Sequence, residues 1–564
     1  MKRNNFYNKW GVAFLIITII SSSCKKYLEE KPTTQFTADF VFNTPEGLEA
    51  GVNALYSFQR EFWENGANNG SNVIVIDAKD DLTINRNAEV ANYGRIFCGT
   101  TPDNDCGGVY SNYWRTYYRI VDRANALIKA ADEISMDESI KKRLVAEAKF
   151  FRANSIFILY RLFNNIYVTT EPTTPENALT IIQDKTPVAD IYKQINEDLT
   201  YSIENLPWTT AEFGRITQGA ARHVKAEVAL WQQNWQEAKT QAEAVIAQTG
   251  IHSLVSQTGL VFRGDLKNTE NLWVLQWKRN ENGKAHKINF NLMPNYAELT
   301  PGSKYSIEQG GRGFGWLTLN NYLRDLLAAD PNDTRIKGSY YIKDYVFNDA
   351  ATLPAGQVLG AVLNFAPTTP WKEFDESAAN RNGFFIRMNA GCKKYFPDDG
   401  IPTEDNQTKN IAVFRLAETM LFAAEANLML GNIGTSTDDA TAGTALGQLN
   451  TVRVRAGTAR ATAITMDSIL NEQARELAFE GKRLYMLKRL GLLYNYIVDH
   501  SGYGMPGDLS PENSTAGGAD NTPEKPLPYR TDARRAMQPH MVNWPIPRAE
   551  MNLLGPNYPQ NTGY

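Results

Sequence analysis

The sequence predicts an all-α protein: tetratricopeptide-like stacked helix pairs that carry an irregular, loop-rich ligand-binding region. Two observations lead to this fold class. Apolar residues recur at alternating three- and four-residue steps in several long segments, which is the period of one helix face. These segments come in pairs, with small residues where two backbones would approach. Recurring helix pairs form stacks in which each pair completes the core of its neighbour.

Residues 1–23 are predicted to be a lipoprotein signal peptide. Three basic residues precede an apolar run at 10–20, whose 11 residues fall short of the roughly 20 that span a bilayer. Three serines at 21–23 then precede Cys24, a layout that resembles the lipobox of bacterial lipoproteins. We expect Cys24 to be lipidated and to anchor the chain. The alternative is an ordinary secreted protein with an incidental cysteine.

The composition argues against a nucleic-acid partner. Lys+Arg number 58 and Asp+Glu 62, so the net charge is -4, and it falls further once the basic signal peptide is removed. Of the four cysteines, Cys98 and Cys106 flank a short loop and can close into a disulfide in an oxidising compartment. Whether they do so is left open by the sequence.

Helical segments are predicted at about 112–249 and 412–490, within a single body that spans 24–564. The segment 146–163 is apolar on two faces and is therefore expected to lie between neighbours. Residues 220–250 are predicted to form two helices joined at Asn234. Residues 476–491 are predicted to form one helix. Its acidic residues lie in the N-terminal half and its basic residues in the C-terminal half, an order that the helix macrodipole favours.

Irregular segments interrupt this scaffold at about 65–111 and 250–410, and a C-terminal tail follows at 491–564. The long middle segment mixes Gly, Pro, Asn and Asp with aromatic residues. It is too long for a plain connector and too aromatic for a disordered one. Binding residues are commonly found on such loops when a rigid base supports them.

Eight blocks follow one another along nearly the whole chain: "SCKKYLEEKP" (23–32), "YWRTYYRIVDRANALI" (113–128), "AEAKFFRANSIFILYRLFNNIYV" (146–168), "RITQGAARHVKAEVALW" (215–231), "FRLAETMLFAAEANLMLG" (414–431), "LNTVRVRAG" (449–457), "ILNEQARELAFEGKRLYMLKRLG" (469–491) and "WPIPRAEMNLLGPNYPQNTGY" (544–564). In this order they resemble the SusD-like, or RagB/SusD, nutrient-binding outer-membrane lipoproteins of the Bacteroidota. Two short departures, at 164–168 and at Tyr485-Met486, leave the expected fold unchanged.

The resemblance implies a cell-surface, lipid-anchored protein of polysaccharide utilisation. Such a protein captures an oligosaccharide at the outer membrane and delivers it to a SusC-like TonB-dependent transporter. An alternative keeps the fold and the complex but changes the cargo to peptides. The identity of the glycan cannot be read from the sequence.

The sequence predicts no catalytic residue, no metal site and no cofactor. No G-x-S-x-G, P-loop or H-E-x-x-H motif occurs, and the five histidines have no metal-ligand spacing. Carboxylates cluster at 77–81 and 397–400, where solvated loops or a calcium-binding turn are favoured over glycosidase chemistry. A glycan-degrading hydrolase therefore remains a distant alternative.

Two loops are predicted to bind the ligand, because flat aromatic rings and planar polar groups suit sugars. The first is 77–93 and the second 296–316, where glycines allow close approach of a ligand. For each aromatic residue the alternative is local packing. The predicted ligand-binding residues are Asp80, Asn92 and Tyr93 in the first loop, and Tyr296, Arg312 and Trp316 in the second.

Overall fold

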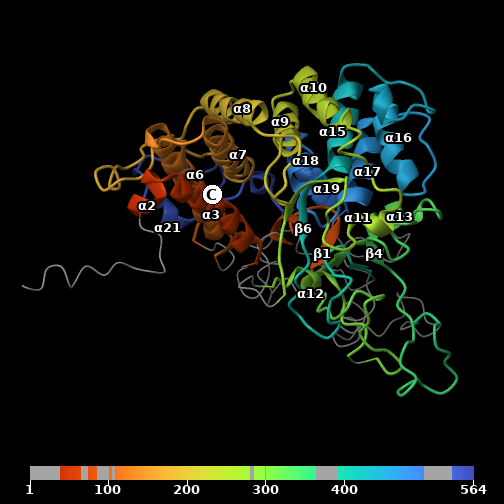
Figure 1. The fold of residues 1–564 in the computed structure, drawn as a ribbon. Coiled ribbons are helices and arrows are strands. Elements are labelled where there is room, and N and C mark those ends of the chain that lie inside the picture. The colour runs from red at the N-terminus through yellow and green to blue at the C-terminus, as the bar shows by residue number, and fades with distance from the viewer. Residues whose placement is uncertain are drawn as a thin grey trace, which may run out of the picture.

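The computed structural model describes residues 38–64, 74–85, 101–103, 108–279, 285–298, 300–363, 390–500 and 537–564. Helices dominate this part of the chain, and its strands form two-stranded antiparallel sheets, which confirms the predicted all-α class. Figure 1 shows helices gathered in the upper part of the molecule, with loop-rich segments from the middle of the chain extending below them. None of the described helices combines the length and apolarity that crossing a membrane requires.

The predicted helical range 112–249 begins with a helix pair, α6 (Val109–Glu133) and α7 (Glu138–Phe163). The Asp137 carboxylate accepts hydrogen bonds from two backbone amides of the first turn and so caps α7. Because α7 is apolar on two faces, it packs between α6 and α8. The other helices of this part are α2 (Ala38–Asn43), α3 (Pro45–Glu64) and α8 (Val188–Asn205).

The second predicted pair is α9 (Gln218–Trp231) and α10 (Trp235–Ile246), which meet at Asn234 as expected. The Asn234 side chain accepts a hydrogen bond from the Glu237 amide and caps α10. A third pair is formed by α15 (Leu416–Met429) and α16 (Ala445–Arg455), and α15 packs onto α10, although the whole irregular region separates them in sequence. The stack is thus interrupted along the chain but continuous in space (Figure 1).

The prediction of a single helix at 476–491 is wrong. Helix α17 (Met466–Leu477) ends before Phe479, which adopts a φ of 67°. Two further helices follow, α18 (Arg483–Arg489) and α19 (Leu493–His500). The acidic residues here do not serve the helix dipole, because they are buried and paired with bases from elsewhere in the chain.

A buried ionic cluster explains this break. Arg415 contacts Glu476 at 3.0 Å and Glu480 at 2.7 Å, on either side of the break, and Arg335 contacts Glu472 at 2.8 Å. Burial alone would raise the pKa of Glu472, but the surrounding arginines hold it down at about 2. The cluster ties α17 to the irregular region, since Arg335 and Arg415 lie outside the helix.

The loop-rich region is organised by short elements. Its strands pair as β1 with β3, β2 with β6, and β4 with β5. The bounds are α4 (Ile74–Asp77), β1 (Thr83–Asn85), α11 (Thr258–Val261), β2 (Asn271–Leu275), α12 (Ile288–Leu292), β3 (Leu317–Leu319), α13 (Asn321–Ala328), β4 (Tyr341–Ile342), β5 (Gly391–Cys392) and β6 (Ile411–Arg415), with η3 (Ala440–Ala442), η4 (Pro539–Val542) and α21 (Arg548–Met551) later in the chain.

The last residues of the chain return to the first helix pair. The buried ring of Trp544 lies 4.6 Å from the ring of Tyr110, and its backbone amide donates to the Leu162 carbonyl at 2.8 Å. The predicted tail is therefore partly structural, because residues 537–564 complete the core beside α6 and α7.

Candidate functional site

Strand pairing brings the two predicted ligand-binding loops together. Strand β1 lies antiparallel to β3, with Thr83 opposite Leu319 and Asn85 opposite Leu317. Because Leu317 directly follows Trp316, this pairing places the first loop beside the end of the second. The predicted residues Asn92 and Tyr93 lie outside the described residues, as do Cys24, Cys98 and Cys106.

The carboxylates at 77–81 are buried, which corrects the expectation of a solvated loop. Asp81 forms a two-pronged ion pair with Arg483, at 2.7 and 2.8 Å, and Asp77 accepts a hydrogen bond from the Gly481 amide at 2.9 Å. These contacts fix the start of β1 against the turn between α17 and α18.

Asp80 lies inside this buried cluster and is only 1% exposed. Its Oδ1 accepts a hydrogen bond from the Leu82 amide at 2.8 Å. Burial, aided by the neighbouring carboxylates, raises the pKa of Asp80 well above its ordinary value. Asp80 therefore stabilises the loop through buried contacts, and its carboxylate is not exposed to a ligand.

Burial alternates along the glycine-rich segment 310–316, which is not a strand, because Gly311 and Gly315 adopt φ of 68° and 63°. Its odd-numbered glycines are buried, whereas Arg312, Phe314 and Trp316 are half-buried and share the other side. A Cβ on Gly313 would come within 1.9 Å of the Met293 carbonyl oxygen, so no larger residue fits there without a shift. Gly313 thus allows the backbone to press onto Met293, and Gly311 packs as closely against the Phe396 ring, while the large side chains between these glycines remain half-buried.

The outward side chains form an aromatic face, which we define as Phe290, Arg312, Phe314 and Trp316. The rings of Phe290 and Phe314 are stacked, with centroids 5.6 Å apart and planes inclined by 15°. The ring of Trp316 lies 5.0 Å from that of Phe314, inclined by 53°. All three rings are half-buried, so each keeps part of its surface open.

Arg312 provides the polar edge of the aromatic face. Its Nη1 lies 2.9 Å from Asp405 Oδ1 and its Nη2 lies 3.8 Å from Glu298 Oε2. Its guanidinium carbon lies 6.0 Å from the centroid of the Phe290 ring. These paired charges sit at the surface, where they can exchange partners with a polar ligand.

Tyr296 lies apart from the aromatic face because it is fully buried. Its ring stacks on Tyr345 with centroids 4.7 Å apart, and its hydroxyl accepts a hydrogen bond from the Ser306 amide at 3.1 Å. It stabilises a small core below the glycine-rich segment. Of the predicted residues that the structure describes, Arg312 and Trp316 meet on one surface, whereas Asp80 and Tyr296 do not.

Sequence reasoning missed four residues around this surface: Phe290, Phe314, Glu298 and Asp405. Phe314 lies within the predicted loop 296–316, between two of its glycines, but loop composition alone does not show which side chains are exposed. Phe290 and Asp405 join Arg312 through tertiary contacts that carry no local signal.

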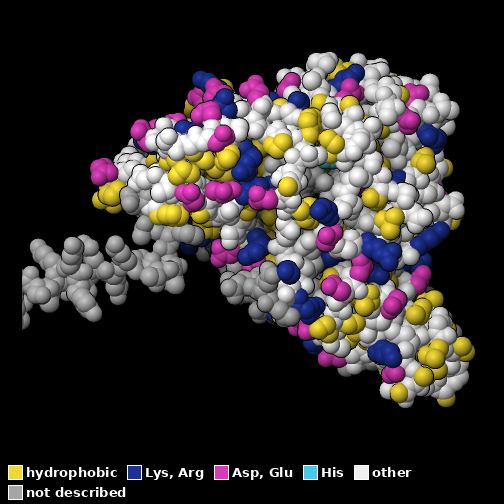
Figure 2. All heavy atoms as spheres, viewed as in Figure 1, with side chains coloured by type: hydrophobic (Ala, Val, Ile, Leu, Met, Phe, Trp, Pro, Cys, Tyr) yellow, Lys and Arg dark blue, Asp and Glu magenta, His cyan; other side chains and the backbone are white. Residues whose placement is uncertain are grey.

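Charge on the visible surface is mixed. Figure 2 shows basic and acidic side chains interspersed on the face drawn. In the part of the chain that the structure describes, no three His, Cys, Asp or Glu residues are grouped as a metal site would require. The helix pairs thus support a surface on which aromatic rings lie beside an arginine and two carboxylates. This arrangement is typical of a protein that binds a ligand on its surface.

Comparison with known proteins identifies the family. The model of the SusD family matches residues 269–564, and a second model, described as starch-binding and associating with the outer membrane, matches residues 26–230. The chain belongs to the SusD family, which confirms the predicted resemblance. The description of the second model as starch-binding agrees with the prediction of a binding protein rather than an enzyme. The second description supports association with the outer membrane.

Individual relatives agree with this assignment. SusD-like protein P2 of Formosa agariphila is 25% identical over 512 residues, which cover 86% of this chain and 91% of that protein. A laminarin-binding SusD-like protein of known structure has a TM-score of 0.67 at 21% identity, covering 93% of this chain and 100% of its own. Surface glycan-binding protein A of Bacteroides thetaiotaomicron has a TM-score of 0.67 at 18% identity, with the same coverage. These structures establish the fold.

Proposed function

We propose that this protein is a lipid-anchored glycan-binding protein of the outer-membrane surface, which captures an oligosaccharide on the aromatic face and delivers it to a SusC-like TonB-dependent transporter. The observation that carries the proposal is the row of three half-buried rings beside Arg312. Sugars present C–H faces that stack on flat rings, and their hydroxyls bond to planar charged groups.

The order of groups on the face suits a chain of sugar units. The rings of Phe290, Phe314 and Trp316 follow one another with centroids 5.0 to 5.6 Å apart, and the parts of them that remain exposed form a continuous apolar contact for a ligand. Arg312 and its carboxylate partners then provide donors and acceptors at one edge. A ligand that lies along the face meets apolar and polar groups together, as an oligosaccharide requires.

Two proteins of similar structure support a carbohydrate cargo, since one is a laminarin-binding protein and the other a surface glycan-binding protein. Anchoring through Cys24 is supported by the serines before it and by the family description. The described chain begins at Ala38, so 13 residues lie between it and the anchor. At about 3.4 Å per extended residue, this tether reaches at most about 50 Å.

The test is a binding screen with the mature wild-type protein. Oligosaccharides that differ in linkage and length are titrated calorimetrically, in parallel with a panel of peptides. The proposal predicts that at least one oligosaccharide binds and that the peptides do not. Binding of peptides alone would contradict the proposal and favour the alternative in which the protein carries peptides. Co-purification of a TonB-dependent barrel in mild detergent tests the partner, and isolation of the free monomer alone would contradict it.

A further inference from the structure

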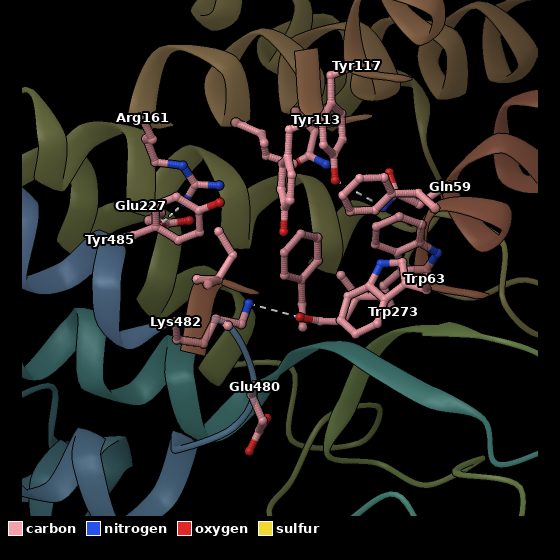
Figure 3. A pocket seen from close by; sticks show the side chains of 17 residues that line it. Gln59, Trp63, Tyr113, Tyr117, Arg161, Glu227, Trp273, Glu480, Lys482 and Tyr485 are labelled. Carbon is pink, nitrogen blue, oxygen red and sulfur yellow. Dashed lines mark hydrogen bonds and ion pairs between the residues drawn. The ribbon is translucent and has the colours of Figure 1, made fainter. Parts of the chain in front are cut away.

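Groups that a ligand can reach lie on the aromatic face and not in the hollow between α3, α6, α7 and the β2–β6 sheet. The rings of Trp63, Tyr113 and Tyr485 on the wall of that hollow are only 2 to 7% exposed. Figure 3 shows its Arg161 beside Glu227, with which it pairs at 2.5 Å. The aromatic face, in contrast, ends in charged side chains that are 30 to 49% exposed.

Arg312 is the basic residue of the aromatic face, and both ends of its guanidinium already face a carboxylate. Its Nη1 donates to Asp405 Oδ1 at 2.9 Å, and its Nη2 lies 3.8 Å from Glu298 Oε2. Arginine binds a ligand carboxylate most strongly through two parallel hydrogen bonds from this fork. A uronate could form them here only by displacing one of the two carboxylates.

Both carboxylates are held beside the guanidinium by contacts of their own. The Asn295 side chain, which is 5% exposed, donates to Glu298 Oε2 at 2.5 Å and accepts from the Glu298 amide at 3.2 Å. The Arg312 amide donates at 2.7 Å to the carbonyl of Pro402, in the loop that carries Asp405. An anionic group that approaches the arginine therefore meets two acceptors of its own charge.

The next charged pair along this edge does not change the balance. Arg279 contacts Glu404 at 3.0 Å, so these two charges cancel. In the described ion pairs of the edge, two basic side chains thus face three acidic ones, and one negative charge is left over. This excess repels a ligand that carries carboxylate or sulfate groups and does not act against an uncharged sugar.

We propose that the aromatic face selects neutral glycans and rejects uronates and sulfated sugars, with Glu298 and Asp405 as the residues that set this specificity. The selection rests on the proposed function, because it concerns the ligand of the same face. Hydroxyls of a neutral sugar can donate to the carboxylates and accept from the guanidinium while the ion pairs stay closed. The charged group of an anionic sugar can only accept, so it gains nothing from the carboxylates.

The test is calorimetric titration of the mature protein with neutral and anionic probes, at low and at high salt. The neutral probes are laminari-, malto-, cello-, xylo- and manno-hexaose. The anionic probes are hexamers of galacturonate and of mannuronate, and a sulfated galactan oligosaccharide. Every anionic probe should bind at least about tenfold more weakly than the best neutral one. Added salt should strengthen any anionic binding, because it screens repulsion, whereas attraction to Arg312 would give the opposite salt dependence.

Two variants test the residues that set the specificity. Asp405→Asn and Glu298→Gln each remove one charge with little change of shape, and each should raise the ratio of anionic to neutral affinity about tenfold. Glu171→Gln is the matched control, because it removes the same charge from an exposed pair with Lys129 of α6, and it should leave the ratio unchanged. Circular dichroism confirms that each variant is folded.

The outcomes separate this selection from the proposed function. An anionic probe that binds as tightly as the best neutral one, or whose binding weakens with salt, would overturn the selection and leave glycan binding standing. The same ratio in wild type, Asp405→Asn and Glu298→Gln would overturn the role of the two carboxylates. Binding of none of the probes would contradict the proposed function and the selection together.

Discussion

The ring of Phe314 lies stacked on the ring of Phe290, and the backbone amide of Phe314 donates to the Phe290 carbonyl at 2.7 Å. Two segments of the loop-rich region are thus joined by both backbone and side chain. The adjacent Gly315 amide donates to the Met293 carbonyl, also at 2.7 Å. The aromatic face is therefore preformed, so a ligand need not order it on binding.

Replacement of Gly313 by alanine should distort the aromatic face. The added Cβ would lie 1.9 Å from the Met293 carbonyl oxygen, so the backbone must shift, at a cost of about 1 to 3 kcal/mol. We expect weaker oligosaccharide binding and a lower melting temperature, with unchanged helical circular dichroism. Gly259→Ala is the matched control, because no atom lies within 4 Å of its added Cβ. Equal affinity in both variants would show that the glycine is not required.

The ion pair between Asp81 and Arg483 should contribute strongly to stability. Both side chains are buried, and loss of one partner leaves an uncompensated charge, which costs about 3 to 5 kcal/mol. Arg483→Met should lower the free energy of unfolding by that amount in denaturant titrations. Arg548→Met removes an exposed pair with Asp103 and should leave stability unchanged. Similar midpoints for the two variants would argue against this role.

Asp77 should make stability fall as the pH rises. Burial raises its pKa from 3.8 to about 7, so the folded state holds the proton more tightly than the unfolded state. This contribution is complete below about pH 4 and is lost as the pH rises through about 7. Relative to wild type, Asp77→Asn should therefore gain about 2 kcal/mol in unfolding free energy between pH 5 and pH 8. Parallel pH profiles would rule out the shift.

Cys24→Ala should release the protein from the outer membrane. The expectation rests on the predicted lipobox, since a short apolar run cannot anchor the chain by spanning. Cell fractionation and immunoblotting measure the shift. Cys392→Ala is the control, because burial raises the pKa of that thiol to about 12 and leaves it inert. Retention of the Cys24 variant in the membrane fraction would refute lipid anchoring at this residue.

The helix pairs were predictable because their signals are local. The apolar period of α7 and the joint at Asn234 depend on neighbouring residues alone. The break between α17 and α18 was not predictable, because Glu476 and Glu480 are held by Arg415, which comes from strand β6. The sequence pattern favoured a dipole-matched helix, and tertiary ion pairs overrode it.

The same distinction holds at the candidate site. The two loops were identified by composition, and β1–β3 pairing brings them together. Composition does not tell which side chains face outward: Tyr296 and Asp80 are buried by partners elsewhere in the chain, whereas Trp316 keeps an open surface. Phe290 had no signal, since only the folded contact with Phe314 shows its place.

The central claim is that the aromatic face binds the glycan. Its most direct test is calorimetric titration of Trp316→Ala and Phe314→Ala with an oligosaccharide that binds the wild type. Each variant loses one stacking surface, and we predict that its affinity falls by about 1 to 3 kcal/mol while the fold is retained. Trp235→Ala, a half-buried tryptophan at the start of α10, is the control and should bind as wild type does. Unchanged affinity in both folded face variants would contradict the account and place the glycan site elsewhere.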